Sequence, residues 1–524
     1  MQIRFHGAVN GQVTGSCTEF FYKRTNTRFL VDCGMVQGAA HAAALNARPF
    51  AFDPRSIKFV LLTHAHLDHC GLLPKLCKDG FIGKVFCARA TAEAAKAIML
   101  DSAGMPDSPY EKKDVSRVTF EALDDKPDFG LSRPRPIDQD LFASFTRSAH
   151  LPGAVSITLQ WQEDGDDMRH ITMSGDIGPN TKDNPYQSLL AGRQEPYGYP
   201  DYIVLESTYG DRLRDPEFAD RDARLKALDD IVRESVIERS GPLVIPCFSM
   251  QRTQEVLFDL YCLYSRSRDA SPFTAPLVAR AKFEEILAGE PINERLYASL
   301  RCAVEERCHA DGVSVISAFV ERRNGSSKPK YVLAGCSDDM RERLRHYFTV
   351  ARVAQPLIVH LESPLARRIT EIWRMCLKDR QKKKPDETVF RNRRLKDWLG
   401  LVTEEDVDRV MDEVFSYADP SNRDSGTVRV GGLTIHYGNS FEIPEEGDER
   451  PVVVISSGGM CEGGPIVNLL PTALRMGAVT IAVTGYMAKN TAGARMVEAM
   501  GPPSDMRHGK LQFKIQQKSK GKIE

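Results

Sequence analysis

Four side chains of the kinds that bind metal ions follow one apolar run within six residues. The run at 58–62 has the composition of a buried strand, and His64, His66, Asp68 and His69 come directly after it. Imidazole nitrogen and carboxylate oxygen suit zinc and neighbouring divalent ions, and the absence of cysteine here favours a catalytic site over a closed structural one. The alternative is a solvated loop rich in histidine, although the whole chain has only 12 histidines.

The spacing of these residues favours two ions. His64 and His66 alternate along an extended segment and face one ion from the same side, whereas Asp68 and His69 lie beyond a turn and suit a second ion. Two ions about 3.5 to 4 Å apart lower the pKa of a bridging water and stabilise both oxygens of a phosphoryl transfer. The pattern therefore predicts a hydrolytic centre.

Composition limits the other possibilities. With 524 residues the chain has room for two or more domains, and a net charge of −1 gives no overall attraction to nucleic acid or to a membrane. No apolar run approaches the roughly 20 residues of a spanning helix. The 12 cysteines include no C-x-x-C pair, which favours free thiols, and the N-terminus begins as a strand without a signal region. We expect a cytoplasmic protein that does not bind membranes.

Three more polar residues stand at the ends of predicted strands or just before one. Asp32 closes a strand at 28–32, where it could orient the histidine loop or simply occupy a turn. His150 precedes an alternating strand at 155–159, and Asp176 follows a strand that ends in Gly175. Taken alone, a structural histidine and a turn aspartate remain alternatives for the last two.

Two helices are predicted after the histidine loop. Residues 71–78 form the first, and Thr91 is expected to act as the N-cap of the second, which runs to Ser102.

These strings are similar to motifs of a known family. The His-x-His-x-Asp-His string at 64–69 resembles the second motif of the metallo-β-lactamase fold, the turn at His150 resembles the third, and Gly175-Asp176 resembles the fourth. Leu-Glu-Ser-Thr-Tyr-Gly at 205–210 looks like motif A of the β-CASP branch, whose nucleases process RNA and DNA. Further likenesses to this branch follow in order at 241–254, 362–366, 452–465 and 484–493.

The resemblance implies an α/β fold, in which a metallo-β-lactamase αββα sandwich carries an inserted β-CASP α/β cap and nucleic acid lies between them. The expected domains are the N-terminal part of the core at 1–209, the cap at 210–490, and a return to the core at 491–524. Extra cap sequence lies near 265–350 and 376–430. The second insertion contains a predicted helix from a capping box at Thr403 to about Ser416.

The resemblance also assigns metal ligands position by position. The first ion would be held by His64, His66 and His150, and the second by Asp68 and His69, with Asp176 bridging both. Two zinc ions are expected, or one if a missing ligand is not replaced, and manganese is an alternative.

Other roles follow from the same likeness. Asp68 and Glu206 are the expected catalytic residues, and Glu206 would hydrogen-bond the family's motif B histidine. The expected contacts to nucleic acid are Ser249, Arg252, Ser457 and Gly458. For Arg252, an ion pair at the start of a helix is an equal alternative.

A basic run adds an open question. Residues 367–396 contain twelve Lys or Arg and four acids. Such a run is either a solvated face or a track for nucleic acid.

The chain departs from the branch at its end. Motifs B and C, which carry the general-acid histidine and one further ligand, would lie beyond Glu524. The sequence is then a fragment, or a second chain or protein partner completes the site, or the protein is weakly active or inactive.

Three functions remain possible. The first is a zinc-dependent ribonuclease that hydrolyses RNA, with DNA as a less favoured substrate, by a metal-bridging hydroxide between core and cap. The second is an inactive β-CASP scaffold subunit that binds RNA or a partner nuclease. The third is a small-molecule metallohydrolase, which would not need the cap.

Overall fold

A computed structural model describes most of the chain. The described residues lie between 1 and 500, with several short segments left out. Residues 501–524, the greater part of the expected return to the core, are not described. The segments left out are 10, 39–40, 124–132, 164–166, 180–186, 191–193, 212–220, 239–240, 266–273, 277–279, 306–318, 324–328, 336, 351, 355, 382–383, 423–425, 439–450, 476–478, 486 and 488–490.

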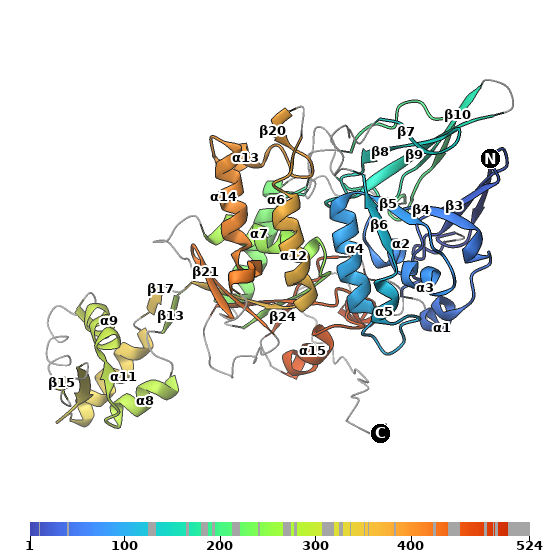
Figure 1. The fold of residues 1–524 in the computed structure, drawn as a ribbon. Helices are drawn as coiled ribbons and strands as arrows, with labels where there is room; N and C mark the ends of the chain where they lie inside the picture. The colour runs from blue at the N-terminus through green and yellow to red at the C-terminus, as the bar shows by residue number, and fades with distance from the viewer. Residues whose placement is uncertain are drawn as a thin grey trace.

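The N-terminal part folds into two sheets (Figure 1). The first has the order β1-β2-β3-β4-β5-β6, with strands at Gln2–Phe5, Thr18–Tyr22, Thr27–Val31, Ile57–Leu61, Lys84–Cys87 and Thr119–Ala122. The second has the order β11-β10-β9-β8-β7, and in chain order its strands β7 to β11 are Arg135–Asp138, Leu141–Arg147, Val155–Gln162, Met168–Met173 and Tyr202–Val204.

A row of stacked aromatic rings lies on the face of the first sheet that packs against the second sheet. Phe20, Phe29 and Phe59 are cross-strand neighbours in the first sheet, and their rings stack at centroid distances of 5.1 and 4.9 Å. They belong to the same buried cluster as Phe145 and Ile157 of the second sheet. Because successive strand residues point to opposite faces, this apolar face leaves the other face of the first sheet for helices.

Helices cover that other face. The core helices α1 to α5 are Ala42–Ala47, Leu67–Cys70, Leu73–Lys78, Arg89–Ser102 and Lys112–Val115. Leu30, Val60 and Val85 of the sheet share a buried cluster with residues of α3 and α4. The prediction that Thr91 caps α4 is wrong, because α4 begins two residues earlier and Thr91 Oγ1 donates instead to the Gly153 carbonyl at 2.7 Å.

The cap is built on a mainly parallel sheet of order β21-β22-β18-β23-β12-β24. In that order its strands are Thr427–Val430, Leu433–Tyr437, Leu357–Glu362, Val452–Ser457, Leu243–Cys247 and Thr480–Ile481. Alternate residues of these strands enter two separate buried clusters. The sheet therefore has helices on both faces, as expected for parallel strands.

The helices of the cap divide between those faces. α7 (Arg252–Tyr264), α12 (Pro364–Cys376) and α14 (Glu404–Val414) share one cluster, and α15 (Ile466–Arg475) and α16 (Ala492–Met500) share the other. The predicted capping box is confirmed, since Thr403 and Asp406 bond each other's backbone at the start of α14. The remaining cap elements are α6 (Arg221–Val232), β19 (Arg380–Gln381), β20 (Lys384–Thr388) and α13 (Leu395–Leu399).

Core and cap touch along α4 and α12, which lie side by side in Figure 1. Arg89 pairs with Asp379 at 2.6 Å across this contact, and Arg147 Nη1 donates to the Val389 carbonyl at 2.7 Å. The predicted α/β architecture of facing sheets with an α/β cap is thus confirmed.

A further unit stands apart from the cap in Figure 1. A two-stranded ribbon of β13 (Thr274–Pro276) and β17 (Arg352–Ala354) joins it to the body. Its elements are α8 (Arg280–Leu287), β14 (Ile292–Asn293), α9 (Glu294–Glu305), β15 (Phe319–Arg322), β16 (Lys330–Leu333) and α11 (Asp338–Val350). We call residues 280–350 the lobe.

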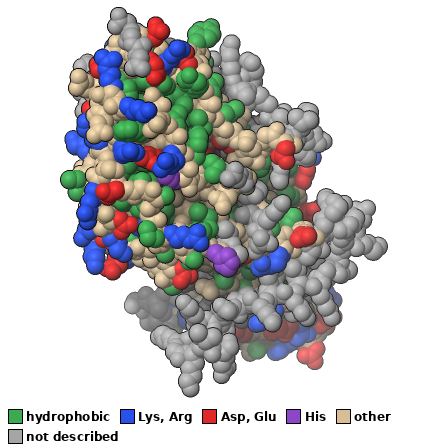
Figure 2. Space-filling model, turned by 90° about the vertical axis from the view of Figure 1, so that its right-hand side faces the viewer, with side chains coloured by type: hydrophobic (Ala, Val, Ile, Leu, Met, Phe, Trp, Pro, Cys, Tyr) green, Lys and Arg blue, Asp and Glu red, His purple; other side chains and the backbone are tan. Residues whose placement is uncertain are grey.

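The surface of the core agrees with the near-zero net charge. On the face seen in Figure 2, basic and acidic side chains are interspersed rather than gathered by sign. Among the helices of the described chain, none is both long and apolar enough to span a membrane.

Candidate metal centre

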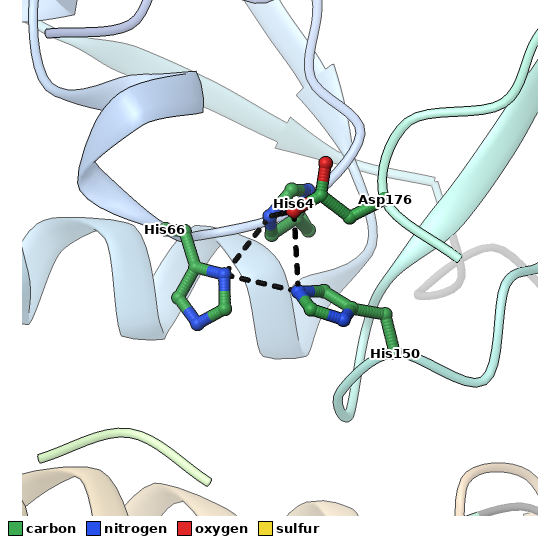
Figure 3. Close-up of side chains that lie close together, drawn as sticks. All are labelled: His64, His66, His150 and Asp176. Carbon is green, nitrogen blue, oxygen red and sulfur yellow. Dashed lines mark hydrogen bonds and ion pairs between the residues drawn. The ribbon is translucent and has the colours of Figure 1, made fainter. Parts of the chain in front are cut away.

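Three segments meet at one edge of the two sheets. His64 and His66 follow β4, His150 lies in the turn before β9, and Asp176 follows β10. Their side chains converge in Figure 3. His64, His66, His150 and Asp176 each offer one ligand atom, and these four atoms lie within 4.8 Å of one another.

The spacing of these atoms suits one tetrahedral ion. His66 Nδ1 lies 3.0 Å from His150 Nε2 and 3.1 Å from His64 Nε2. Asp176 Oδ2 lies 3.5 Å from His150 Nε2 and 3.7 Å from His64 Nε2. Zinc with bonds of about 2.0 to 2.1 Å keeps its tetrahedral ligand atoms about 3.3 Å apart. The donor set therefore fits zinc or a neighbouring divalent ion.

Asp32 orients two of the histidines from behind. Its carboxylate accepts from His69 Nδ1 at 2.7 Å, from the Thr63 amide at 2.9 Å and from Thr63 Oγ1 at 3.0 Å. Thr63 Oγ1 in turn lies 3.1 Å from His64 Nδ1. With both Nδ1 atoms held this way, the Nε2 atoms of His64 and His69 point toward Asp176, which is the arrangement that prepares a histidine to bind metal.

His69 and Asp68 lie on the second side of Asp176. His69 Nε2 is 3.1 Å from Asp176 Oδ1 and 3.9 Å from Asp68 Oδ2. Asp176 thus presents one oxygen to the first group of histidines and the other to His69. This is the position that the sequence predicted for a bridging carboxylate.

The electrostatics keep the first group ready for a cation. Burial lowers the pKa of His66 to about 4 and lowers the pKa values of His64 and His150 as well, so these imidazoles are neutral at pH 7. Burial would raise the pKa of Asp176, but His69 and His64 beside its carboxylate hold that pKa well below its usual range. The site is open to solvent on one side, since the Asp176 side chain is 29% exposed while that of His64 is 1% exposed.

Glu206 holds the loop that carries Asp176. Its Oε1 accepts from the Ile177 amide at 3.0 Å, and its Oε2 accepts from the Thr208 amide at 3.2 Å. No histidine contact to Glu206 is present among the described residues, so the contact with motif B stays a prediction. The structure gives Glu206 a positioning contact instead, one residue from the metal cluster.

The predicted contacts to nucleic acid lie in the cap. Ser249 follows β12, and Ser457 and Gly458 end β23, so all three lie at the carboxyl ends of parallel strands, where α/β sheets bind ligands. Cap segments, yellow-green and tan as in Figure 1, run opposite His66 and His150 in Figure 3. Arg252 is the first residue of α7.

Sequence reasoning missed several residues that shape the site. Thr63 links Asp32 to His64, and its position between the strand and the first histidine was the available signal. Gly34 is required because a Cβ there would lie 1.6 Å from the Asp68 carbonyl oxygen. Ser363 begins α12 and lies 3.3 Å from Ser249, Oγ to Oγ.

Comparison with known proteins agrees with both parts of the fold. A family model described as the metallo-beta-lactamase superfamily matches residues 14–162, and a model of the Beta-Casp domain matches 343–496. The chain belongs to the β-CASP branch of the metallo-β-lactamase superfamily. The two matched stretches contain His64 to His150 in the core, and α12, β23 and the first half of α16 in this β-CASP chain's cap.

Several curated relatives share part of their length with this β-CASP chain. "Ribonuclease TTHA0252" of Thermus thermophilus is 34% identical over 245 residues, which are 45% of this chain and 49% of the relative. "Transcription termination factor FttA" of Methanocaldococcus jannaschii is 26% identical over 265 residues, 50% and 39% of the two chains. "Cleavage and polyadenylation specificity factor 73" of Drosophila melanogaster is 26% identical over 274 residues, 51% and 37%. The chain thus spans half or less of each of these relatives.

Proposed function

We propose that the protein is a zinc-dependent ribonuclease that hydrolyses RNA phosphodiester bonds between core and cap. The observation that carries the proposal is the tetrahedral spacing of one carboxylate and three neutral imidazoles, contributed by residues from His64 to Asp176. One of the relatives is named a ribonuclease, and another a cleavage and polyadenylation specificity factor. Among the nine cysteines whose side chains the structure describes, no disulfide bond is formed, which supports a reducing, cytoplasmic location.

The residues of the chain would divide the work as follows. His64, His66, His150 and Asp176 would hold the first zinc, and Asp68 and His69, with the other oxygen of Asp176, would hold a second. Bound zinc supplies water activation and neutralises charge on the phosphate. Asp32 and Glu206 fix the ligands before substrate arrives, which removes a reorganisation cost from the reaction.

The cap would hold the substrate. Ser249 and Ser457 offer hydroxyls, and the backbone amide of Gly458 offers a further donor at the same sheet edge. Gly458 has a φ of +106°, and a Cβ there would lie 1.9 Å from the Gly463 carbonyl oxygen, so the loop needs glycine to take this shape. Loops of this kind bind phosphate oxygens through backbone amides.

The direct test is cleavage of labelled RNA and labelled DNA with zinc or manganese added, comparing the natural chain with Asp68→Ala. We expect metal-dependent cutting of RNA that the variant loses, because Asp68 would hold the second ion. Asp222→Ala, whose carboxylate is 91% exposed on α6, is the matched control and should cut normally.

Other outcomes select the other functions. Metal and RNA binding without cleavage by the natural chain would favour a scaffold subunit. Turnover of small esters without nuclease activity would favour a small-molecule metallohydrolase.

A further inference from the structure

The lobe is an independent unit that the proposed chemistry does not use. Eight buried apolar side chains of its described residues form a cluster separate from those of core and cap. Residues 280–342 lie outside both matched family stretches. The described residues of the lobe add neither a metal ligand nor a strand to the main sheets, so a role of the lobe would depend on its own surface.

The described helices of the lobe cover one face of its sheet. Its order is β14-β16-β15, and Phe319 of β15 lies opposite Leu333 of β16. Both are buried in the cluster to which α8, α9 and α11 all contribute, so these helices share one face of the sheet. The alternate residues point the other way.

Those alternate residues form a surface that we call the lobe sheet face: Val320, Arg322, Lys330 and Val332. Val320 lies opposite Val332, and Arg322 lies opposite Lys330. Val320 is 47% exposed, and both cations are exposed. No helix of the described lobe packs against this face.

The two cations Arg322 and Lys330 lie opposite each other, and their repulsion lowers the stability of the folded lobe. Like charges directly opposite each other on neighbouring strands repel. Within the part of the chain that the structure describes, neither side chain has an acidic partner, and the nearby Glu321 pairs with Arg323. An anion bound between the two cations would turn this repulsion into attraction.

We propose that the lobe sheet face binds the sugar–phosphate backbone of RNA that extends beyond the metal centre. The inference rests on the proposed function, since it supplies a second contact for the same substrate. Two cations suit phosphate, and the two valines can lie against sugar rings. No aromatic ring of the described strands lies on this face for base stacking, because Phe319 and Tyr331 point to the helices. The contact is therefore independent of base sequence and sensitive to salt.

The test is the affinity of the full chain for RNA, measured by fluorescence anisotropy in EDTA so that no cleavage occurs. The probe is a labelled single-stranded RNA of about 30 nucleotides, and we expect the double variant Arg322→Ala, Lys330→Ala to raise Kd about tenfold. The slope of log K against log salt should fall by about 1.4, because each phosphate contact with a single strand contributes about 0.7.

The matched control is Arg341→Ala, which removes an exposed cation from α11 on the helical side of the lobe. Its Kd and salt slope should equal those of the natural chain. With metal restored, the double variant should cut an RNA too short to reach the lobe at the natural rate, and should show a raised KM on the long RNA.

Two outcomes separate this inference from the proposed function. Equal Kd and equal salt slope for the double variant and the natural chain would overturn the lobe contact, even if RNA is cleaved, and would leave the face to an acidic protein. A natural chain that binds RNA through the lobe but never cleaves it would overturn the ribonuclease proposal and leave the lobe contact standing.

Discussion

Asp32 is not an expected metal ligand, but its carboxylate orients two of the expected ligands. It is 2% exposed, and its carboxylate accepts hydrogen bonds from Ser16, Thr63 and His69. It also has a φ of +60°, a conformation that few side chains other than those of Asn and Asp adopt readily. One buried carboxylate thus sets the direction of both His64 and His69.

Replacing Asp32 by Asn should therefore weaken metal binding without unfolding the chain. Asn keeps the size and tolerates the positive φ, but its neutral amide holds the imidazole less firmly. We expect zinc affinity to fall about 10- to 100-fold, measured by calorimetric titration of the metal-free protein. Ser16→Ala removes only one 3.2 Å contact to the same carboxylate and should change the affinity far less. Equal affinities for Asp32→Asn and the natural chain would contradict the account of Asp32.

The histidine loop could be predicted at this scale because its ligand types and spacing are local. The segment 64–69 carries four of the expected ligands: His64, His66, Asp68 and His69. Two more, His150 and Asp176, lie beside this segment as expected. The roles of Thr63 and Gly34 were missed, because they depend on contacts with residues 31 and 34 positions away.

At the scale of elements, a buried clasp joins the segment 187–190 to α7. Glu255 accepts from the backbone amides of Ser188 and Leu189, each at 3.2 Å. Asp259 accepts from Ser188 Oγ at 3.1 Å, and Arg224 of α6 pairs with Asp259 at 3.0 Å. Burial raises the pKa of Glu255 to about 7.

This clasp predicts a pH dependence of stability. The folded pKa of Glu255 lies above its ordinary value of 4.5, so its contribution to stability is fully present below pH 4.5 and is lost as the pH rises to about 7. Glu255→Gln removes that loss. The unfolding free energy of the variant, relative to the natural chain, should rise between pH 4.5 and 8 by at most about 3 kcal/mol.

Urea unfolding at several pH values measures this difference. Glu405→Gln, on the exposed side of α14, is the matched control. Parallel pH profiles for Glu255→Gln and the natural chain would show that Glu255 does not titrate in this range.

Part of the basic run at 367–396 forms an ion-pair network with α14. Arg374 and Lys378 of the α12 region pair with Asp412 of α14. Arg391, only 1% exposed, pairs with both Glu404 and Asp408 of the same helix. These three cations already pair with carboxylates of α14. For this part of the run, that favours the structural interpretation over a track for nucleic acid.

Arg391→Ala should therefore cost stability and leave RNA affinity unchanged. Removing Arg391 takes its buried partner from Glu404 and leaves Asp408 with Arg380 alone, at a cost of at most about 3 to 5 kcal/mol. Urea unfolding checks the first part, and anisotropy at a temperature where the variant is folded checks the second. Arg394→Ala, at an exposed position, should change stability by less than about 0.5 kcal/mol. A loss of RNA affinity without loss of stability would restore the nucleic-acid track.

Predictions about helices and their caps were correct where the signal was local. They were wrong where a tertiary contact determined the role of the side chain. The capping box at Thr403 was identified correctly because its two partners are three residues apart. Thr91 was assigned as a cap wrongly, because its hydroxyl is used by Gly153, 62 residues away.

On the scale of the whole molecule, the sequence indicated a core with a cap but not the independence of the lobe. The motifs mark strand ends in the core and the cap, and those of the core converge at one edge of its two sheets. The lobe carries no such motif, and only its separate buried cluster and the β13–β17 ribbon identify it as a unit. From sequence alone, the lobe was predicted only as extra sequence inserted in the cap.

The central claim is that His64, His66, His150 and Asp176 surround one metal ion. An anomalous difference map from a crystal of the zinc-loaded protein, recorded at the zinc absorption edge, tests it most directly. We predict a peak among these four side chains, about 2.0 to 2.2 Å from each ligand atom, and a second peak beside Asp68 and His69. A map without a peak between the three histidines would contradict the account.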